Sequence, residues 1–367
     1  MKNLLFILFS IFVFVGCVEK TVVIPDETVI SQPKPAEVLP EEVLSESEPA
    51  IIEPEQVIID ENVSTRIAVI YPSKVVGKYA KSTLSTISAF LLFNNVEFEI
   101  ETFDTKDESS FSIEKELLSL KQKGFTKVIA LFTQNGFSIL NSLEGSKDLE
   151  MYFPLLNKKE IYSQNENFIF GGISYSEQLD LLQTLSNGRN TMFYVKSYLG
   201  NKLKNSYLES FNPGIIKEIE RTSIRFKSIM NDKRMVGTTV LLNTPIIKTS
   251  IIMSQLTAYD INPAKILSTQ LNFNPLLIKL TQDRDRKNFF IVNSISEVDN
   301  FIEDYSKLLG SDIRYNWVDY SSLVGVNYLL NKNESELIQT QVMDRQVDYE
   351  PTLYRTTSYG FQKVLTN

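Results

Sequence analysis

The sequence of 367 residues has no histidine and only one cysteine, Cys17. The absence of histidine removes the usual general base near neutral pH and the commonest metal ligand. A single cysteine cannot form an intramolecular disulfide or a zinc site made of several cysteines. These absences exclude histidine-based catalytic triads and much metal chemistry, whereas catalysis by carboxylates or by serine and lysine stays open.

Catalytic and phosphate-binding motifs are missing as well. Residues 172–176 approach the nucleophile motif G-x-S-x-G but lack its second glycine. The sequence contains neither the phosphate-binding loop G-x-x-x-x-G-K followed by Ser or Thr nor an EF-hand calcium loop. Carboxylate pairs for glycoside hydrolysis meet only in space, so the sequence leaves them open. We expect a protein that is not an enzyme and that holds no metal and no cofactor.

Positive charge is scarce in one part of the chain. The net charge is −8, and residues 18–63 carry ten Glu and two Asp against two Lys. The remainder is therefore close to neutral, and it shows no basic stripe. We expect no nucleic-acid partner, because such proteins carry a clustered positive surface.

An apolar run over residues 4–15 follows Lys2 at the N-terminus. About a dozen residues at 1.5 Å each are too few to span a hydrocarbon core of about 30 Å, and they fit a secretory signal. The segment Phe14-Val15-Gly16-Cys17 resembles the lipobox of bacterial lipoproteins. The resemblance implies a lipoprotein signal peptide over residues 1–17 and a Cys17 acylated with palmitate-like chains that bind the lipid bilayer. A simple cleaved signal or a buried cysteine are the alternatives.

Residues 18–63 contain six prolines and no glycine, and their apolar residues keep no helix or strand period. Prolines at these intervals limit the length of any helix or central strand, and the repelling glutamates favour an extended chain. We predict a disordered linker that reaches at most roughly 140 Å in polyproline geometry. In the alternative interpretation, apolar pairs such as Ile58-Ile59 are short docking strands.

From residue 65 the sequence alternates between strand and helix patterns. Residues 66–71 form a β-branched run ended by Pro72, which is typical of a strand buried on both faces. Further strands are predicted at 96–103, 127–132, 191–195, 218–226, 239–243, 265–268 and 289–293, and helices at 74–94, 113–123, 176–185, 203–211, 245–259, 276–281, 298–309 and 320–330. The alternation predicts parallel sheets covered by helices, and two sets of similar size predict two lobes.

Three segments, 65–72, the pair Gly171-Gly172 and 315–323 (YNWVDYSSL), resemble type I periplasmic binding proteins. This family includes branched-chain amino-acid binding proteins and the lipoprotein activators of penicillin-binding proteins. The resemblance implies an α/β fold of two Rossmann-like lobes with parallel sheets, joined by three crossings, with ligands in the cleft between them. We assign residues 64–172 plus 298–367 to lobe 1 and residues 173–297 to lobe 2.

Ligands of open parallel sheets bind beyond the carboxyl ends of the strands. The amides and hydroxyls expected there can orient a polar solute, although the same residue types cap helices and form turns. The ligand-binding candidates are Ser73, Thr133, Gln134, Asn135, Tyr175, Ser197, Tyr198, Asn243, Thr244, Gln270, Asn293 and Ser294. Amino-acid binders of the family place small hydroxyl residues where residues 133–135 stand, which argues against an α-amino acid as ligand.

Two functions stay open. The first is a periplasm-facing lipoprotein whose non-catalytic recognition domain acts through a partner protein of the cell envelope, as regulators of peptidoglycan synthesis do. The alternative is a binding protein for a small polar solute (amino acid, peptide or muropeptide) that feeds a transporter or sensor. The long linker favours the first function, because a protein anchored in the outer membrane needs reach. Val18 after Cys17 also resembles outer-membrane sorting signals, so we predict the outer rather than the inner membrane.

Overall fold

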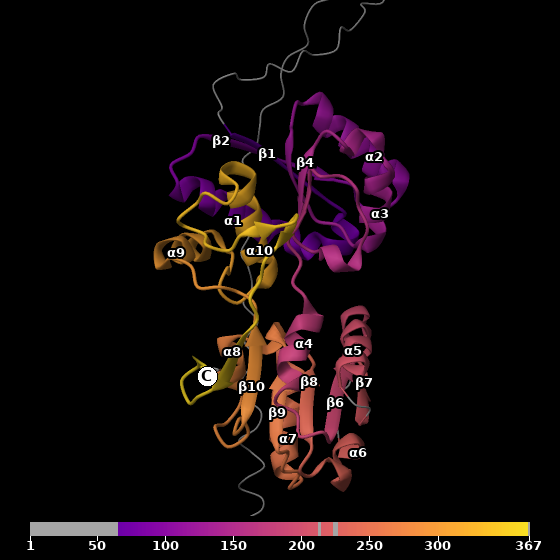
Figure 1. Ribbon diagram of the computed structural model, residues 1–367, viewed down its shortest axis with the longest axis vertical. Helices are drawn as coiled ribbons and strands as arrows, with labels where there is room; N and C mark the ends of the chain where they lie inside the picture. The colour runs from indigo at the N-terminus through magenta and orange to yellow at the C-terminus, as the bar shows by residue number, and fades with distance from the viewer. Residues whose placement is uncertain (1–64, 212–213, 223–226, 366–367) are drawn as a thin grey trace, which may run out of the picture. The chain divides into compact units, whose positions relative to one another are not determined.

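The computed structural model describes residues 65–211, 214–222 and 227–365. The predicted signal peptide, Cys17 and the linker over residues 18–63 lie outside these residues. In the described part the strands form two seven-stranded sheets, and helices cover both faces of each sheet (Figure 1). The predicted fold class, two α/β lobes, is confirmed.

The sheet of lobe 1 has the strand order β11-β12-β5-β4-β3-β1-β2. All neighbouring strands in it are parallel except β11 and β12. Its strands are β1 (Thr65–Tyr71), β2 (Phe98–Asp104), β3 (Lys127–Ala130), β4 (Glu150–Phe153), β5 (Phe168–Phe170), β11 (Val342–Met343) and β12 (Gln346–Val347). The α-helices of this lobe are α1 (Ser73–Phe93), α2 (Ser110–Gln122), α3 (Gln134–Ser142), α9 (Asn300–Leu309) and α10 (Trp317–Asn331). Short 3-10 helices span Glu144–Ser146 (η1) and Lys158–Glu160 (η2).

The sheet of lobe 2 has the order β7-β6-β8-β9-β10-β13-β14. The first five strands in this order are parallel, whereas β13 and β14 are antiparallel additions. Its strands are β6 (Asn190–Val195), β7 (Ile215–Ile219), β8 (Thr239–Asn243), β9 (Lys265–Ser268), β10 (Phe289–Asn293), β13 (Thr352–Thr356) and β14 (Phe361–Lys363). The helices are α4 (Tyr175–Gln183), α5 (Tyr198–Ser210), α6 (Lys227–Met230), α7 (Ile246–Ala258) and α8 (Pro275–Leu280), with 3-10 turns at Lys233–Met235 (η3) and Gln270–Asn272 (η4).

Strand β1 shows why these sheets are buried on both faces. Ile67 and Val69 pack into one core, which includes side chains of α1, α9 and α10. Ala68 and Ile70 pack into another core with side chains of α2 and α3. All four side chains are fully buried, as expected of a β-branched run in a parallel sheet.

The first crossing between the lobes contains Gly171 and Gly172, and both glycines lie too close to their neighbours for a side chain. A Cβ on Gly171 would lie 2.1 Å from the hydroxyl of Tyr152, and one on Gly172 would lie 2.4 Å from the backbone of Leu156. The carbonyl of Gly171 accepts hydrogen bonds from Ser321 Oγ (2.9 Å) and from Tyr349 Oη (2.7 Å).

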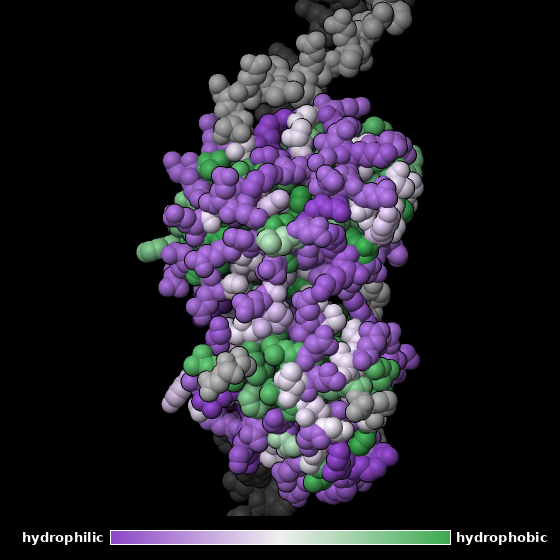
Figure 2. Space-filling model, in the orientation of Figure 1, coloured by the Kyte–Doolittle hydropathy of each residue, from purple (hydrophilic) through white to green (hydrophobic). Residues whose placement is uncertain are grey.

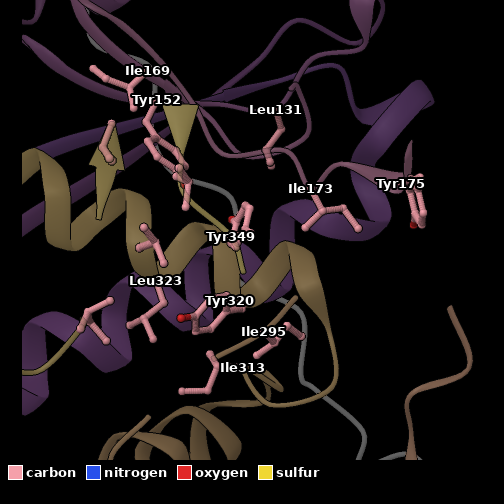
Figure 3. Packing of buried hydrophobic residues seen from close by; sticks show 14 of the residues in the cluster. Leu131, Tyr152, Ile169, Ile173, Tyr175, Ile295, Ile313, Tyr320, Leu323 and Tyr349 are labelled. Carbon is pink, nitrogen blue, oxygen red and sulfur yellow. The ribbon is translucent and has the colours of Figure 1, made fainter. Parts of the chain in front are cut away.

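Tyr349 belongs to the third crossing, which connects β12 to β13, so this carbonyl joins two of the crossings. Figure 3 shows Tyr152 and Tyr349 in this packed region. Burial raises the pKa of both phenols, so they remain neutral donors at physiological pH. The structure therefore links the two crossings through a dry network of uncharged hydrogen bonds.

Three parts of the sequence interpretation differ from the structure. Residues 298–367 were assigned as a whole to lobe 1, but β13 and β14 extend the second sheet beside β10, while α9 and α10 pack on α1. The strand predicted at 218–226 is β7, which spans Ile215–Ile219, and residues 223–226 of that prediction lie outside the described residues. The sequence analysis also predicted no element at β4, β5, α3, α6, β11, β12, β13 or β14.

No helix in the described residues is long and apolar enough to cross a bilayer.

Candidate functional site

A cavity of about 210 Å³ lies where the cleft is predicted, at the carboxyl ends of the strands of lobe 1. Its walls come from the start of α1, the segments that follow β3 and β4, the first crossing, and α5 of lobe 2. Thr133, Gln134 and Tyr175 are the predicted candidates that line it. The sequence interpretation missed most of the other lining side chains, many of them apolar: Val76, Phe132, Leu155, Ile173, Leu199 and Trp317.

Several polar groups of the cavity are engaged within the protein. Thr133 caps α3, and its backbone N–H and its hydroxyl donate to the two carboxylate oxygens of Glu108 at 2.7 and 2.6 Å. Gln134 Nε2 donates to Glu160 Oε2 at 3.2 Å. Tyr175 is buried, and this burial raises its pKa. A ligand that uses these groups must displace bonds that already exist.

Two ion pairs connect the lobes beside this cavity. Lys202 of α5 binds Glu160 of η2 at 2.6 Å, and both side chains are about one-third exposed. Lys159 of η2 binds Glu177 of α4, and this hydrogen bond raises the pKa of Lys159. Glu160 therefore bonds to Gln134 in its own lobe and to Lys202 in the other. The cavity opening is restrained by charge-assisted contacts.

The candidates at the carboxyl edge of the second sheet serve mainly structural roles. Gln178 of α4, which the sequence interpretation missed, donates through Nε2 to Gln270 Oε1 at 2.6 Å and to Ser294 Oγ at 2.8 Å. Gln178 Oε1 accepts from the backbone N–H of Gln270 at 3.1 Å. This network ties α4 to the ends of β9 and β10. Its location in α4, away from the strand ends, explains why strand-edge reasoning did not find it.

Two further candidates on this edge also have internal partners. The hydroxyl of Thr244 shares a bond of 2.7 Å with that of Thr249, and the amide of Asn293 bonds to the backbone of Ile295 at 3.1 and 3.3 Å. Asn243 differs: it is 2% exposed, and neither atom of its carboxamide has a hydrogen-bond partner. Of the candidates on this edge, Asn243 has both a donor and an acceptor unused.

The other candidates are not brought into the cavity. The backbone N–H of Ser73 donates to Asp104 Oδ1 at 3.0 Å. Ser197 caps α5 by accepting from the N–H of Gly200 at 3.1 Å, and Tyr198 is the first residue of that helix. Asn135 is exposed on α3. Ligand contact by the twelve candidates stays a prediction. Among the described residues there is no group of three or more acidic, cysteine or histidine side chains placed to hold a metal ion.

Comparison with known proteins gives structural but no sequence relatives. No family model matches the sequence, and no curated protein matches it. One similar solved structure is the branched-chain amino acid transporter substrate binding protein LivJ from Streptococcus pneumoniae, in complex with isoleucine. It superposes with a TM-score of 0.58 at 10% identity, and the match covers 82% of this chain and 99% of that one. A putative branched-chain amino acid ABC transporter protein from Rhodospirillum rubrum gives 0.62 at 11% identity, covering 82% and 99%.

A third similar structure is the C-domain of LpoA from Haemophilus influenzae, described as a regulator of PBP1A. It superposes with a TM-score of 0.56 at 12% identity, covering 82% of this chain and 100% of that one. The chain has the type I periplasmic binding protein fold. This periplasmic binding protein fold is shared by the ligand-binding proteins and by the regulator, so the fold alone does not choose between the two functions.

Proposed function

We propose that this chain is a lipid-anchored protein of the bacterial cell envelope whose two-lobed, non-catalytic body recognises a partner protein. The observation that carries the proposal is the state of the interlobe cavity. At about 210 Å³ it lies below the roughly 300–1,000 Å³ of typical small-molecule sites, and the polar groups of Thr133 and Gln134 in it already have partners within the protein. The LpoA C-domain, a regulator rather than a transport protein, supports this function at the level of fold.

The connections between the lobes support the same function. A protein that closes on a solute needs crossings that bend, because closure is a hinge motion. Here the carbonyl of Gly171 is bound by Ser321 of α10 and Tyr349 of the third crossing, and the Glu160–Lys202 pair joins the lobes next to the cavity. These contacts resist opening and closing, and they suit a body that presents a fixed surface.

Helix α9 offers such a surface. Phe301 and Leu308 are 71% and 83% exposed, and Tyr305 between them is also exposed. Residues spaced by four and three positions share one helix face, so the three side chains form an apolar stripe on the solvent side of α9. The opposite face, with Ile302 and Ser306 buried, packs on α1, and the half-exposed Tyr305 at the border of the stripe meets Phe93 of α1 edge to face at 5.6 Å. Contiguous exposed apolar side chains of this kind mark protein interaction sites.

The anchor and its location complete the proposal. Acylation of Cys17 would attach the chain to a bilayer, and the linker over residues 18–63 would give the body a reach of at most roughly 140 Å. That reach suits an outer-membrane anchor and a partner across the cell wall, such as a protein of peptidoglycan synthesis. The solved structures with this fold are binding proteins and a regulator, consistent with a protein that is not an enzyme.

The test is photo-crosslinking from α9 in the cell. A photoreactive amino acid replaces Leu308 in the full-length lipoprotein, and a matched version carries it at Ile247, which is exposed on α7 of lobe 2. We expect one envelope protein to crosslink from position 308 and not from position 247. The same partner should be lost from Leu308→Glu in co-purification. Equal crosslinking from both positions would contradict the proposed surface.

Asn243 favours the second function, binding of a small polar solute. Its buried carboxamide leaves a donor and an acceptor unused, and groups of this kind usually have a partner. A thermal-shift screen with amino acids, peptides and muropeptides separates the two functions. A solute at a hundredfold excess over its Kd would raise the stability by about 2.7 kcal/mol. A shift that disappears in Asn243→Ala would establish the solute function, and an unshifted panel would favour the partner protein.

A further inference from the structure

A second cavity, larger than the interlobe cavity and sharing no residue with it, lies beside the second crossing, which connects β10 to α9. Its volume is about 400 Å³, against about 210 Å³ for the interlobe cavity. Its walls come from the start of α8, residues 293–298 of the crossing, the first turn of α9, and the turn between β13 and β14. Figure 1 locates these elements, and Figure 2 shows apolar side chains gathered on this face near α8 and β10.

One wall of the cavity is aromatic. Phe273 stands at its centre, with ring centroids 5.9 Å from Tyr315, 4.8 Å from Tyr354 and 4.5 Å from Phe361. Tyr359, in the turn between β13 and β14, also lines the cavity and is 99% exposed. Phe273 packs against each of the other three rings, so together they form an apolar surface on this wall of the cavity.

The remaining wall carries planar polar groups. Arg314 donates from Nη1 to Glu303 Oε2 at 3.3 Å, and its guanidinium carbon lies 5.7 Å from the centre of the Tyr315 ring. Glu303 is buried and also accepts from Lys307 at 2.5 Å. The exposed side chains of Glu297 and Asn300 complete this wall. Arg314 is thus oriented by one carboxylate and one ring, while its other N–H groups stay available.

The cavity lining carries charges of both signs. Glu297 and Glu303 are negative and Arg314 is positive, and Lys307, which lies outside the lining, also pairs with Glu303. A phosphate or a polyanion would meet the two carboxylates, and a polycation would meet Arg314. Like charges at such distances disfavour binding, so the cavity selects against strongly charged ligands.

We propose that this cavity binds an uncharged saccharide. A pyranose ring has C–H faces that pack on aromatic rings and hydroxyls that pair with planar side chains such as the guanidinium, carboxylate and carboxamide. The Phe273 cluster provides the first surface, and Arg314, Glu297 and Asn300 provide the second. The volume lies within the roughly 300–1,000 Å³ usual for small-ligand sites. Because α9 packs in lobe 1 and Tyr354 belongs to the sheet of lobe 2, the saccharide contacts elements of both lobes.

The test is calorimetric titration of the full-length, detergent-solubilised protein with two probes, chitotriose and maltotriose. The variants are Asn300→Ala and Tyr359→Ala, both at exposed positions where the fold does not depend on the side chain. The matched control is Tyr162→Ala, which removes another exposed tyrosine, in lobe 1 and outside the cavity. Circular dichroism confirms that each variant is folded.

We expect at least one trisaccharide to bind, and each cavity variant to raise its Kd about tenfold, which corresponds to one lost hydrogen bond or aromatic contact. Tyr162→Ala should leave the Kd unchanged. Absence of binding by both trisaccharides at millimolar concentration would overturn the proposal. Binding with the same Kd in the natural protein and in both cavity variants would overturn it too.

Discussion

The carbonyl of Gly171 gives a prediction that depends on two donors sharing one acceptor. Ser321 Oγ and Tyr349 Oη both bond to this buried oxygen, at 2.9 and 2.7 Å. Removing either donor leaves the carbonyl with the other one. We therefore expect Ser321→Ala and Tyr349→Phe each to lower the free energy of unfolding by about 1 kcal/mol, the usual net contribution of a hydrogen bond.

The double variant leaves the carbonyl of Gly171 without a partner in a dry environment. Its loss should exceed the sum of the two single losses by about 1–3 kcal/mol, the cost of an unpaired buried polar group. The hydroxyl of Tyr152, 3.1 Å from Ser321 Oγ, loses this partner already in Ser321→Ala, so that loss belongs to the single variant and cancels in the comparison.

Urea unfolding of the four proteins, followed by circular dichroism, measures this coupling as a double-mutant cycle. The m-value must stay constant for the comparison to hold. Additive losses would refute the reasoning, because they would mean that water reaches the carbonyl or that the two donors act independently.

Three further predictions address the crossing, the core and the linker. Gly172→Ala should lower the free energy of unfolding, measured by urea titration, by about 1–3 kcal/mol, because the new Cβ would meet the backbone of Leu156. The control is Gly360→Ala, which should change this free energy little, because a Cβ at that position has no atom within 4 Å. Burial raises the pKa of Asp319, so folding favours the protonated carboxyl. The contribution of Asp319 to the free energy of unfolding is therefore fully present below its unfolded pKa. It is lost as the pH rises through its folded pKa. Asp319→Asn should therefore gain stability relative to the natural protein as the pH of the urea titrations rises above the unfolded pKa of 3.8, and a constant difference would contradict this sign. Deleting half of the predicted linker over residues 18–63 should abolish the proposed cellular function without changing the unfolding temperature of the body, and retained function would count against the need for reach.

Much of the fold was predictable from local pattern. The β-branched run before Pro72 and the apolar period after Pro245 correctly located β1 and α7, because burial dictates these patterns residue by residue. The pairing of β12 with β5 was not predictable, since Gln346 meets Phe170 across a large sequence separation and the strand has two residues. Strand β13 likewise carries no pattern that assigns it to the second sheet rather than the first.

The candidate site was also predictable only in part. Sequence reasoning found the cavity's position, because the carboxyl ends of parallel strands meet at one edge. It overestimated the polar groups available there, because the partners that occupy them come from elsewhere in the chain. Glu108, which binds Thr133, lies in the loop that precedes α2. Gln178, which binds Gln270 and Ser294, lies in α4. Such three-dimensional pairings leave no trace in local spacing.

The hairpin of β13 and β14 has a consequence for how the protein is made. Strand β10 has β9 on one side, and its other side is covered only after the third crossing has returned the chain from lobe 1. Until residues 352–363 have been synthesised, the second sheet presents an open edge of backbone N–H and C=O groups. Open edges pair with other chains, so we expect folding during synthesis to pass through an aggregation-prone stage that ends when these strands pair.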